Sequence, residues 1–175
     1  MSKWGPRSRD GGIDRIPLPI PDGELWLCGK HAIGPDVGAA MLRANGAGTV
    51  VCLTERYELA DRYPDYVAWL DTNAADSPVH GRAAAIWHPI PDLHAPSLDD
   101  AEALVTRIVD RLDDGEGVLM HCAAGIGRAG TMATLVLMAV GLNVTEALWT
   151  VGQHRPMAGP EVGAQMDLVE AFSRR

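Results

Sequence analysis

The sequence has 175 residues and a mass of 18.7 kDa, which is the size of a single domain. Hydrophobic residues make up 47% and charged residues 22%, so a disordered or collagen-like chain is excluded. The formal charge of −8 argues against a nucleic-acid partner, whereas one local positive pocket can still attract a small anion. No apolar stretch has the length of a membrane span and no secretory signal is visible, so we expect no membrane partner.

The spacing of cysteines and histidines also limits the chemistry. The three cysteines form no CxxC pair, which argues against a disulfide framework or a structural zinc site and favours a reducing, cytoplasmic location. Five histidines lack metal-ligand spacing and are expected as loop or surface residues, namely His31, His80, His88, His94 and His154. We expect a monomer without a bound metal.

Residues 1–23 are rich in Gly, Pro, Arg and Asp, and their alternating prolines predict an extended N-terminal segment. Strands and helices then alternate over one expected domain, residues 24–175. Short apolar or β-branched runs predict strands at residues 24–28, 49–53, within 83–90 and at 117–120. Helical spacing and end signals predict helices at residues 36–44, 64–71, 97–115, 128–141, 144–153 and 161–172.

This alternation predicts an α/β fold, with a central, mainly parallel sheet that helices flank on both faces. A glycine-rich loop joins the strand at 117–120 to a nearly all-apolar helix. It is therefore expected at the carboxyl end of a central strand, where ligands bind in such folds.

The loop reads HCAAGIGRAGT from His121 to Thr131. Its glycines can adopt backbone angles closed to other residues, so that successive N–H groups turn inward and form an anion-binding nest. The next helix directs its positive end at the same spot, and Arg128 can clamp two oxygens of a phosphate. The expected phosphate cradle consists of the backbone amides of Ala123, Ala124, Gly125, Ile126, Gly127 and Arg128.

The same donors stabilise the thiolate form of Cys122, which lies at the base of the nest. A thiolate there can attack phosphorus in line with the leaving group. His121 is expected to hydrogen-bond around the loop rather than to act as a base. The alternative is that Cys122 is a small buried hydrophobe and that the glycines only make a turn.

This segment resembles the His-Cys-x5-Arg signature of cysteine-dependent protein tyrosine and dual-specificity phosphatases. The resemblance runs from about residue 23 to 172 and is strongest to atypical dual-specificity members and those like kinase-associated phosphatase. VVCLTER at residues 50–56, HPIPD at 88–92 and the Arg-Pro pair at 155–156 also match. The resemblance implies hydrolysis of phosphorylated proteins through a phosphocysteine. It implies no cofactor, because fixed donors stabilise the charge of the transition state.

The resemblance further implies that Asp92 is the general acid and then the base. The chemistry requires an acid, since the departing alcohol or phenol is a poor leaving group unless it is protonated. Asp92 can also be a plain turn carboxylate in a Pro-Asp bend. Asp99 and Asp100 are rival acids, but they fall in the first turn of a predicted helix, where the helix dipole already explains them.

Other family positions are matched less closely. A glutamine after the Arg-Pro pair often positions the attacking water; Gln165 is the best match, Gln153 is the alternative, and either can be a plain surface residue. Ala129 departs from the family, which usually has a Ser or Thr there to stabilise the departing thiolate. Thr131 is a possible substitute, provided that its hydroxyl points toward Cys122.

Cys52 lies on a strand that is expected beside the nucleophile strand. It is either an inert core thiol or, as in some relatives, the partner of Cys122 in a protective disulfide.

The expected function is a phosphomonoester hydrolase that acts on phosphotyrosine and, as a further option, on phosphoserine or phosphothreonine in proteins. The loop has no extra lysine, which disfavours a highly charged inositol phosphate. Two alternatives remain open. Ala129 suggests a slow phosphatase that acts as a phospho-dependent binding module. A rhodanese-like sulfur transferase also uses a cysteine in an anion-binding loop, but it needs no upstream Pro-Asp acid.

Overall fold

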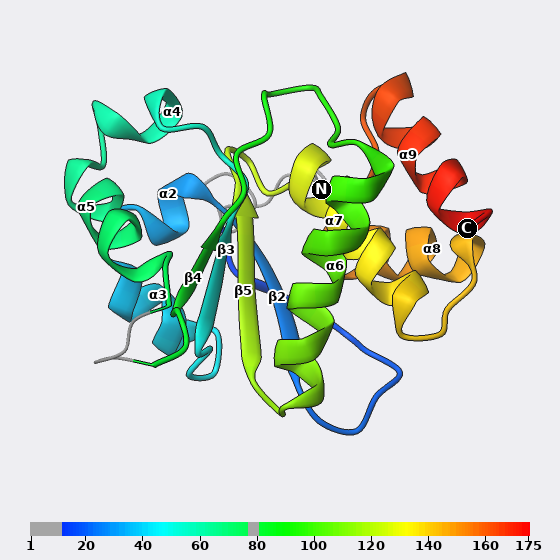
Figure 1. Ribbon diagram of the computed structural model, residues 1–175, viewed down its shortest axis with the longest axis horizontal. Helices are drawn as coiled ribbons and strands as arrows, with labels where there is room; N and C mark the ends of the chain where they lie inside the picture. The colour runs from blue at the N-terminus through cyan, green and yellow to red at the C-terminus, as the bar shows by residue number, and fades with distance from the viewer. Residues whose placement is uncertain (1–11, 77–80) are drawn as a thin grey trace, which may run out of the picture.

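The computed structural model describes residues 12–76 and 81–175. In these residues the strands form one five-stranded sheet in the order β1-β2-β5-β3-β4 (Figure 1). The strands are β1 (Asp14–Ile16), β2 (Glu24–Gly29), β3 (Thr49–Cys52), β4 (Ala85–Trp87) and β5 (Gly117–Cys122). All pairings are parallel except β1 with β2. The α/β class that the sequence predicts is therefore confirmed.

The central strand β5 lies between β2 and β3 and ends at Cys122. In the register of the sheet, Gly29 of β2 is opposite Cys122, and Cys52 of β3 is opposite His121. Three parallel strands therefore end at the same edge of the sheet. The loops that follow these strands meet there, which is the arrangement that builds a ligand site in an open α/β fold.

Helices cover both faces of the sheet, as Figure 1 shows. One face carries α2 (Lys30–Ile33), α3 (Val37–Arg43), α4 (Tyr57–Ala60) and α5 (Pro64–Asn73). The other carries α6 (Leu98–Asp113), α7 (Gly127–Ala139), α8 (Val144–His154) and α9 (Gly163–Ser173). Among the residues that the structure describes, no helix is both long enough and apolar enough to cross a bilayer.

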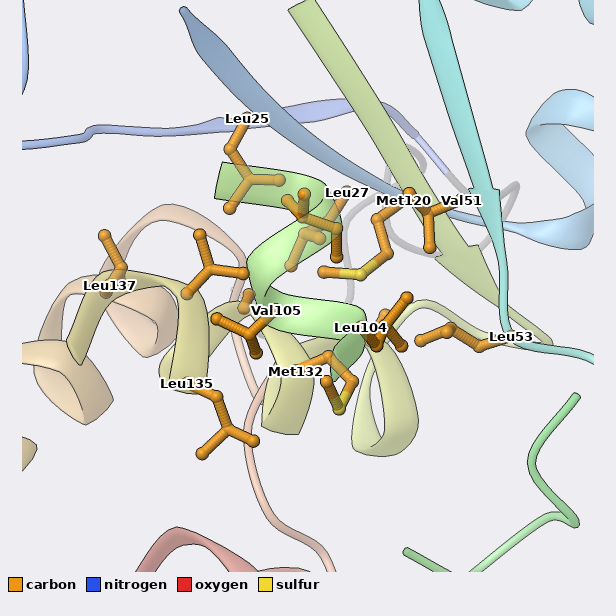
Figure 2. Packing of buried hydrophobic residues seen from close by; sticks show 14 of the residues in the cluster. Leu25, Leu27, Val51, Leu53, Leu104, Val105, Met120, Met132, Leu135 and Leu137 are labelled. Carbon is orange, nitrogen blue, oxygen red and sulfur yellow. The ribbon is translucent and has the colours of Figure 1, made fainter. Parts of the chain in front are cut away.

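Each face has its own hydrophobic core, because strand side chains alternate between the two sides of a sheet. On the α6 and α7 side, Leu27, Met120 and Met132 belong to one buried cluster, part of which Figure 2 shows. On the α3 and α5 side, Tyr66 and Leu70 belong to a second. Since both faces are covered, the central strands are mostly apolar, which explains why they read as continuous runs rather than as alternating patterns.

Local signals in the sequence fix several helix ends. The Ser97 hydroxyl accepts a hydrogen bond of 3.1 Å from the N–H of Asp100 at the start of α6. At the start of α8, the N–H of Glu146 donates to the side chain of Asn143 at 2.9 Å, and the N–H of Asn143 donates to the carboxylate of Glu146 at 3.0 Å. Each such cap stabilises a helix by about 1 kcal/mol. The Ser97 cap also sets where the preceding loop ends.

The structure departs from the predicted elements in three places. β5 continues to Cys122, beyond the strand predicted at 117–120, so the nucleophile candidate is the last residue of the central strand. The one-turn helices α2 and α4 were not predicted, because a single turn shows no helical period. β1, which pairs with β2, was not predicted as a strand; it lies within residues 1–23, the segment that was expected to be extended.

Candidate active site

The candidate site is the loop that connects β5 to α7 at the carboxyl edge of the sheet (Figure 1). β5 positions Cys122 at one end of the loop, and the first turn of α7 positions Arg128 at the other. Both residues are 3% exposed. The buried helix start behind the loop leaves its first N–H groups without helical acceptors, which favours an anion at this point.

Every carbonyl from Cys122 to Ile126 accepts a hydrogen bond from a donor on the outer side of the loop, away from the space that the loop encloses. In loop order, the donors are His121 Nδ1 to Cys122 (3.1 Å), Lys30 N to Ala123 (2.9 Å), Arg155 NH2 to Ala124 (2.9 Å), Arg155 Nε to Gly125 (2.7 Å), and Gly130 N with Gly159 N to Ile126 (2.9 and 3.1 Å). The N–H of a trans peptide points away from its carbonyl, so the amides of the loop are directed inward. Among the described residues, no acceptor is hydrogen-bonded to the N–H groups of residues 123–126.

Gly125 is required by both the backbone angle and the space available. Its φ is 72°, in the left-handed region that favours glycine. A Cβ there would lie 2.3 Å from the carbonyl oxygen of Cys28 and 2.8 Å from NH2 of Arg155. The glycine therefore lets the loop approach β2 and Arg155 closely enough for its carbonyls to be held.

Arg128 is oriented by Glu58, a residue of α4. NH1 and NH2 of Arg128 each donate a hydrogen bond of 2.8 Å to the carboxylate of Glu58, and NH1 also donates to the carbonyl of Ile90 at 2.8 Å. Nε of Arg128 is buried and has no hydrogen-bond partner among the described residues. A buried N–H without a partner is costly, so this edge of the guanidinium is suited to an anionic ligand.

The charges of this pair stabilise each other. Burial acts to raise the pKa of Glu58, but hydrogen bonds from Arg128 and from the Glu55 N–H hold that pKa below its ordinary value. Burial acts to lower the pKa of Arg128, but Glu58 outweighs it and the pKa is raised. Both groups are therefore ionised at neutral pH. The guanidinium is fixed in charge and in direction.

Asp92 approaches the same guanidinium from the loop between β4 and α6. Its Oδ1 lies 3.4 Å from NH2 of Arg128, and its side chain is 63% exposed. Oδ1 also accepts a hydrogen bond of 3.0 Å from the N–H of Leu93, whose φ of 63° is left-handed. The structure thus brings Asp92 and Arg128 together, while Asp99 and Asp100 remain on the exposed first turn of α6.

His121 is buried beneath the loop. Its Nε2 lies 2.6 Å from the hydroxyl of Tyr66, and its Nδ1 lies 3.1 Å from the carbonyl of Cys122. A carbonyl only accepts, so Nδ1 carries the proton and Tyr66 donates to Nε2. Burial lowers the pKa of His121 to about 4. The imidazole is therefore neutral and holds the backbone of the nucleophile candidate.

The two candidate glutamines differ in position. Gln165 is 1% exposed; its Oε1 accepts from the N–H of Glu161 at 2.8 Å, and its Nε2 donates to the carbonyl of His94 at 3.3 Å. It thereby joins the start of α9 to the loop that carries Asp92. Gln153 is exposed on α8. Gln165, but not Gln153, is hydrogen-bonded to a segment of the site among the described residues.

Ala129 and Thr131 are both buried in α7. The hydroxyl of Thr131 has no hydrogen-bond partner among the described residues, so it makes no bond to Cys122. The hydroxyl that Ala129 lacks is therefore not replaced by Thr131 in this structure.

The other two cysteines lie on the opposite face of the sheet from Cys122. Cys52 and Cys28 belong to the core on the α3 and α5 side, whereas Cys122 belongs to the core on the α6 and α7 side. Burial raises the pKa of Cys52 to about 11 and that of Cys28 to about 12. All three cysteines are free. These observations favour Cys52 as an inert core thiol.

Sequence reasoning did not single out three residues that support the loop: Glu58, Tyr66 and Arg155. Glu58 comes a few residues after β3, at the sheet edge where the signature loop lies. Its place after that strand is the sequence feature that could have marked it as a site residue. Arg155 was noted only as part of an Arg-Pro pair. Tyr66 is one of several apolar positions of α5, and nothing in the sequence distinguishes its hydroxyl.

In the part of the chain that the structure describes, no group of three or more His, Cys, Asp and Glu side chains is arranged to hold an ion. His80 lies outside the described residues. The donors assembled around Cys122 are backbone amides and one guanidinium. They suit a phosphate and would not ligate a cation.

Several solved structures that resemble this chain are phosphatases. The crystal structure of Tk-PTP in its active form is 28% identical, covers 89% of this chain and 94% of its own, and superposes with a TM-score of 0.65. Kinase-associated phosphatase with its catalytic cysteine replaced by serine gives a TM-score of 0.71 at 16% identity, over 94% of both chains, and shows the fold alone. The fold and the Cys-x5-Arg loop together define a cysteine-dependent phosphatase of the dual-specificity class.

The family model described as "Polymorphic toxin system, DSP-PTPase phosphatase" matches residues 30–142, and the chain belongs to this family. The match includes Cys122 and Arg128 and ends before Arg155. Dual specificity protein phosphatase 22-B of Danio rerio is 44% identical over 57 residues, which are 32% of this chain and 31% of that protein. The chain thus matches about a third of the length of this relative. The predicted resemblance is confirmed.

Proposed function

We propose that the chain is a phosphomonoester hydrolase that dephosphorylates phosphorylated proteins through a phosphocysteine intermediate. The observation that carries this proposal is the set of donors beside Cys122 that have no acceptor among the described residues, namely the N–H groups of residues 123–126 and Nε of Arg128. A phosphoryl group offers acceptors for all of them. Fixed donors of this kind stabilise the charge of the transition state without having to reorganise.

In the first proposed step, the thiolate of Cys122 attacks phosphorus and the bond from phosphorus to the leaving oxygen breaks. Asp92 donates a proton to that oxygen. In the second step, water attacks the phosphocysteine, Asp92 takes a proton from the water, and the P–S bond breaks to restore the thiolate. The contact of 3.4 Å between Asp92 and Arg128 supports this role, because it brings the carboxyl to the guanidinium that binds phosphate.

Phosphoproteins are the proposed substrates because the chain belongs to a dual-specificity phosphatase family. The loop from Ala123 to Gly127 carries small or apolar side chains, and Glu58 and Asp92 add negative charge beside Arg128. These carboxylates oppose a substrate with several phosphates. A single phosphorylated side chain, phosphotyrosine first, therefore suits the site better than a multiply phosphorylated inositol.

The function is tested by phosphate release from phosphopeptides by the wild type, Cys122→Ser and the control Cys52→Ala. A serine hydroxyl does not ionise at neutral pH, so Cys122→Ser should lose turnover yet still bind vanadate, whereas Cys52→Ala should retain activity. Acid quenching of the wild type during turnover should trap phosphate on Cys122, as detected by mass spectrometry. Residual activity of Cys122→Ser within about tenfold of the wild type would exclude this mechanism. Sulfur transfer from thiosulfate in place of phosphate release would indicate the rhodanese-like alternative.

A further inference from the structure

Arg155 connects the signature loop to the N-terminal segment of the chain. It directly follows α8 and is 2% exposed. On one side, its Nε and NH2 donate to the carbonyls of Gly125 and Ala124 at 2.7 and 2.9 Å. On the other, its NH1 donates to the carbonyl of Gly12 at 2.7 Å and to the carboxylate of Asp14 at 2.8 Å.

The loop side of this contact sets the direction of two peptide groups. Arg155 holds the carbonyls of Ala124 and Gly125 outside the cradle. Each carbonyl shares a rigid trans peptide with the next N–H, so the N–H groups of Gly125 and Ile126 are turned into the cradle. Those two N–H groups have no acceptor among the described residues. The orientation of two phosphate-binding amides therefore depends on where the guanidinium of Arg155 lies.

The N-terminal side of the contact fixes that guanidinium. Asp14 is the first residue of β1, and the side chains of Asp14 and Arg155 are only 5% and 3% exposed. Removal of Asp14 would leave the buried guanidinium of Arg155 without this carboxylate, so the ion pair favours one position of the guanidinium. β1 is three residues long and pairs with β2 at the edge of the sheet, where Asp14 is opposite Leu27.

We propose that Asp14 and the backbone of Gly12 position Arg155, and through it the phosphate-binding amides of the signature loop. This inference rests on the proposed function, since it names residues that prepare the same loop for a phosphoryl group. Gly12 and Asp14 then help to shape the signature loop, although neither belongs to it. Asp14 and Arg155 are positioning residues, because neither contacts the phosphate.

The test compares the affinity for orthovanadate of the wild type, Asp14→Asn, Asp14→Ala and Arg155→Lys. It uses calorimetry well below the temperature at which each variant unfolds. Asp14→Asn keeps an acceptor oxygen but loses the charge, so its affinity should fall roughly tenfold, and that of Asp14→Ala should fall further, as for residues that support ligand groups elsewhere. Arg155→Lys keeps a charge for Asp14 but lacks the fork that holds two carbonyls, so its affinity should also fall.

Glu116→Gln is the matched control. Oε2 of Glu116 lies 3.6 Å from NH1 of the buried Arg111, which also donates to the carbonyl of Ala83. Glu116 directly precedes β5, so it lies at the far end of that strand from Cys122. A purely structural role for Asp14 predicts that Asp14→Asn and Glu116→Gln both lower the unfolding temperature and both keep the wild-type affinity for vanadate. The proposal predicts a loss of affinity for Asp14→Asn alone.

Two outcomes separate this inference from the proposed function. Vanadate affinity of folded Asp14→Asn and Asp14→Ala within about twofold of the wild type, against the roughly tenfold loss expected, overturns the inference and leaves the function intact. A wild type that binds vanadate but releases phosphate from no phosphomonoester overturns the function. The vanadate series would still decide whether Asp14 positions the loop.

Discussion

The carboxylate of Glu58 accepts two hydrogen bonds of 2.8 Å from the NH1 and NH2 groups of Arg128. This fork occupies NH1 and NH2 of the guanidinium and leaves Nε without a hydrogen-bond partner among the described residues. A planar guanidinium held in this way presents its remaining edge in one direction. Glu58 thereby orients the group that we propose to clamp the phosphate.

Replacement of Glu58 should therefore reduce catalysis without removing any group that contacts substrate. We expect Glu58→Gln to lower kcat/KM by roughly 10²-fold, because Arg128 loses a charged anchor and a small misplacement of a catalytic group is costly. The neighbouring Glu55 has no hydrogen bond to Arg128 among the described residues, so Glu55→Gln serves as the control. Steady-state kinetics with an aryl phosphate measures both. Equal activity of the two variants would contradict a positioning role for Glu58.

Stability should fall as the pH falls, and His121 should account for part of this loss. Burial lowers the pKa of His121 to about 4, whereas the unfolded chain has the ordinary value near 6.5. Between these values the unfolded state binds more protons, so the free energy of unfolding falls on acidification, by up to about 1.4 kcal/mol per pH unit for one proton. Glu58, whose pKa is lowered, adds a loss at more acidic pH as its carboxylate becomes protonated.

His121→Asn tests this prediction, because asparagine does not titrate. Its unfolding temperature should be lower than that of the wild type at pH 7 but should change less between about pH 6.5 and 4. Tyr66→Phe removes the hydroxyl that bonds Nε2 yet keeps the imidazole, so it should retain the pH dependence. Parallel pH profiles for the wild type and His121→Asn would refute the assignment to His121.

Much of the fold and the signature loop could be predicted because both depend on local patterns. The strands at β2, β3 and β5 are apolar runs, α6 has a clear helical period, and the glycines of the loop mark its backbone. The mainly parallel sheet with helices on both faces follows from the alternation of strands with helices. In each case the signal lies within a short window of sequence.

The residues that support the loop were not predictable in the same way. Glu58, Tyr66 and Arg155 contact groups that are distant in the sequence, such as Arg128, His121 and Gly12. Such contacts depend on the packing of whole elements and leave no periodic signal. β1 was missed for a related reason: three residues among prolines are too few to show alternation, and the pairing with β2 is what makes them a strand.

Asp92→Asn should slow hydrolysis of phosphotyrosine peptides by roughly 10²–10⁴-fold, which is the usual rate enhancement from a positioned general acid. The loss should be much smaller for aryl phosphates whose leaving group is already a stable anion. Asp99→Asn is the control, since Asp99 lies on the exposed first turn of α6. A series of leaving groups in steady-state assays measures the effect. If the loss is the same for good and poor leaving groups, Asp92 is not the acid.

Breakdown of the phosphocysteine should limit the rate, because Ala129 offers no hydroxyl to the departing thiolate. The hydroxyl of Thr131 makes no hydrogen bond to Cys122 in the structure and so does not replace it. One hydrogen bond to a charged group contributes about 1.5–3 kcal/mol. At about 1.4 kcal/mol for each factor of ten, its absence slows this step by roughly one to two orders of magnitude.

A stopped-flow assay with an activated aryl phosphate should therefore show a burst of leaving group near one equivalent, followed by slow turnover. Ala129→Ser adds the missing donor, so the slow phase should become faster and the burst smaller. Ala129 is fully buried, and Ala129→Gly, which adds no donor, controls for disturbance of α7. Thr131→Val should leave both phases unchanged, since its hydroxyl is unbonded. A wild type without a burst, combined with a slower Thr131→Val, would show instead that Thr131 turns toward Cys122 during the reaction and supplies the donor.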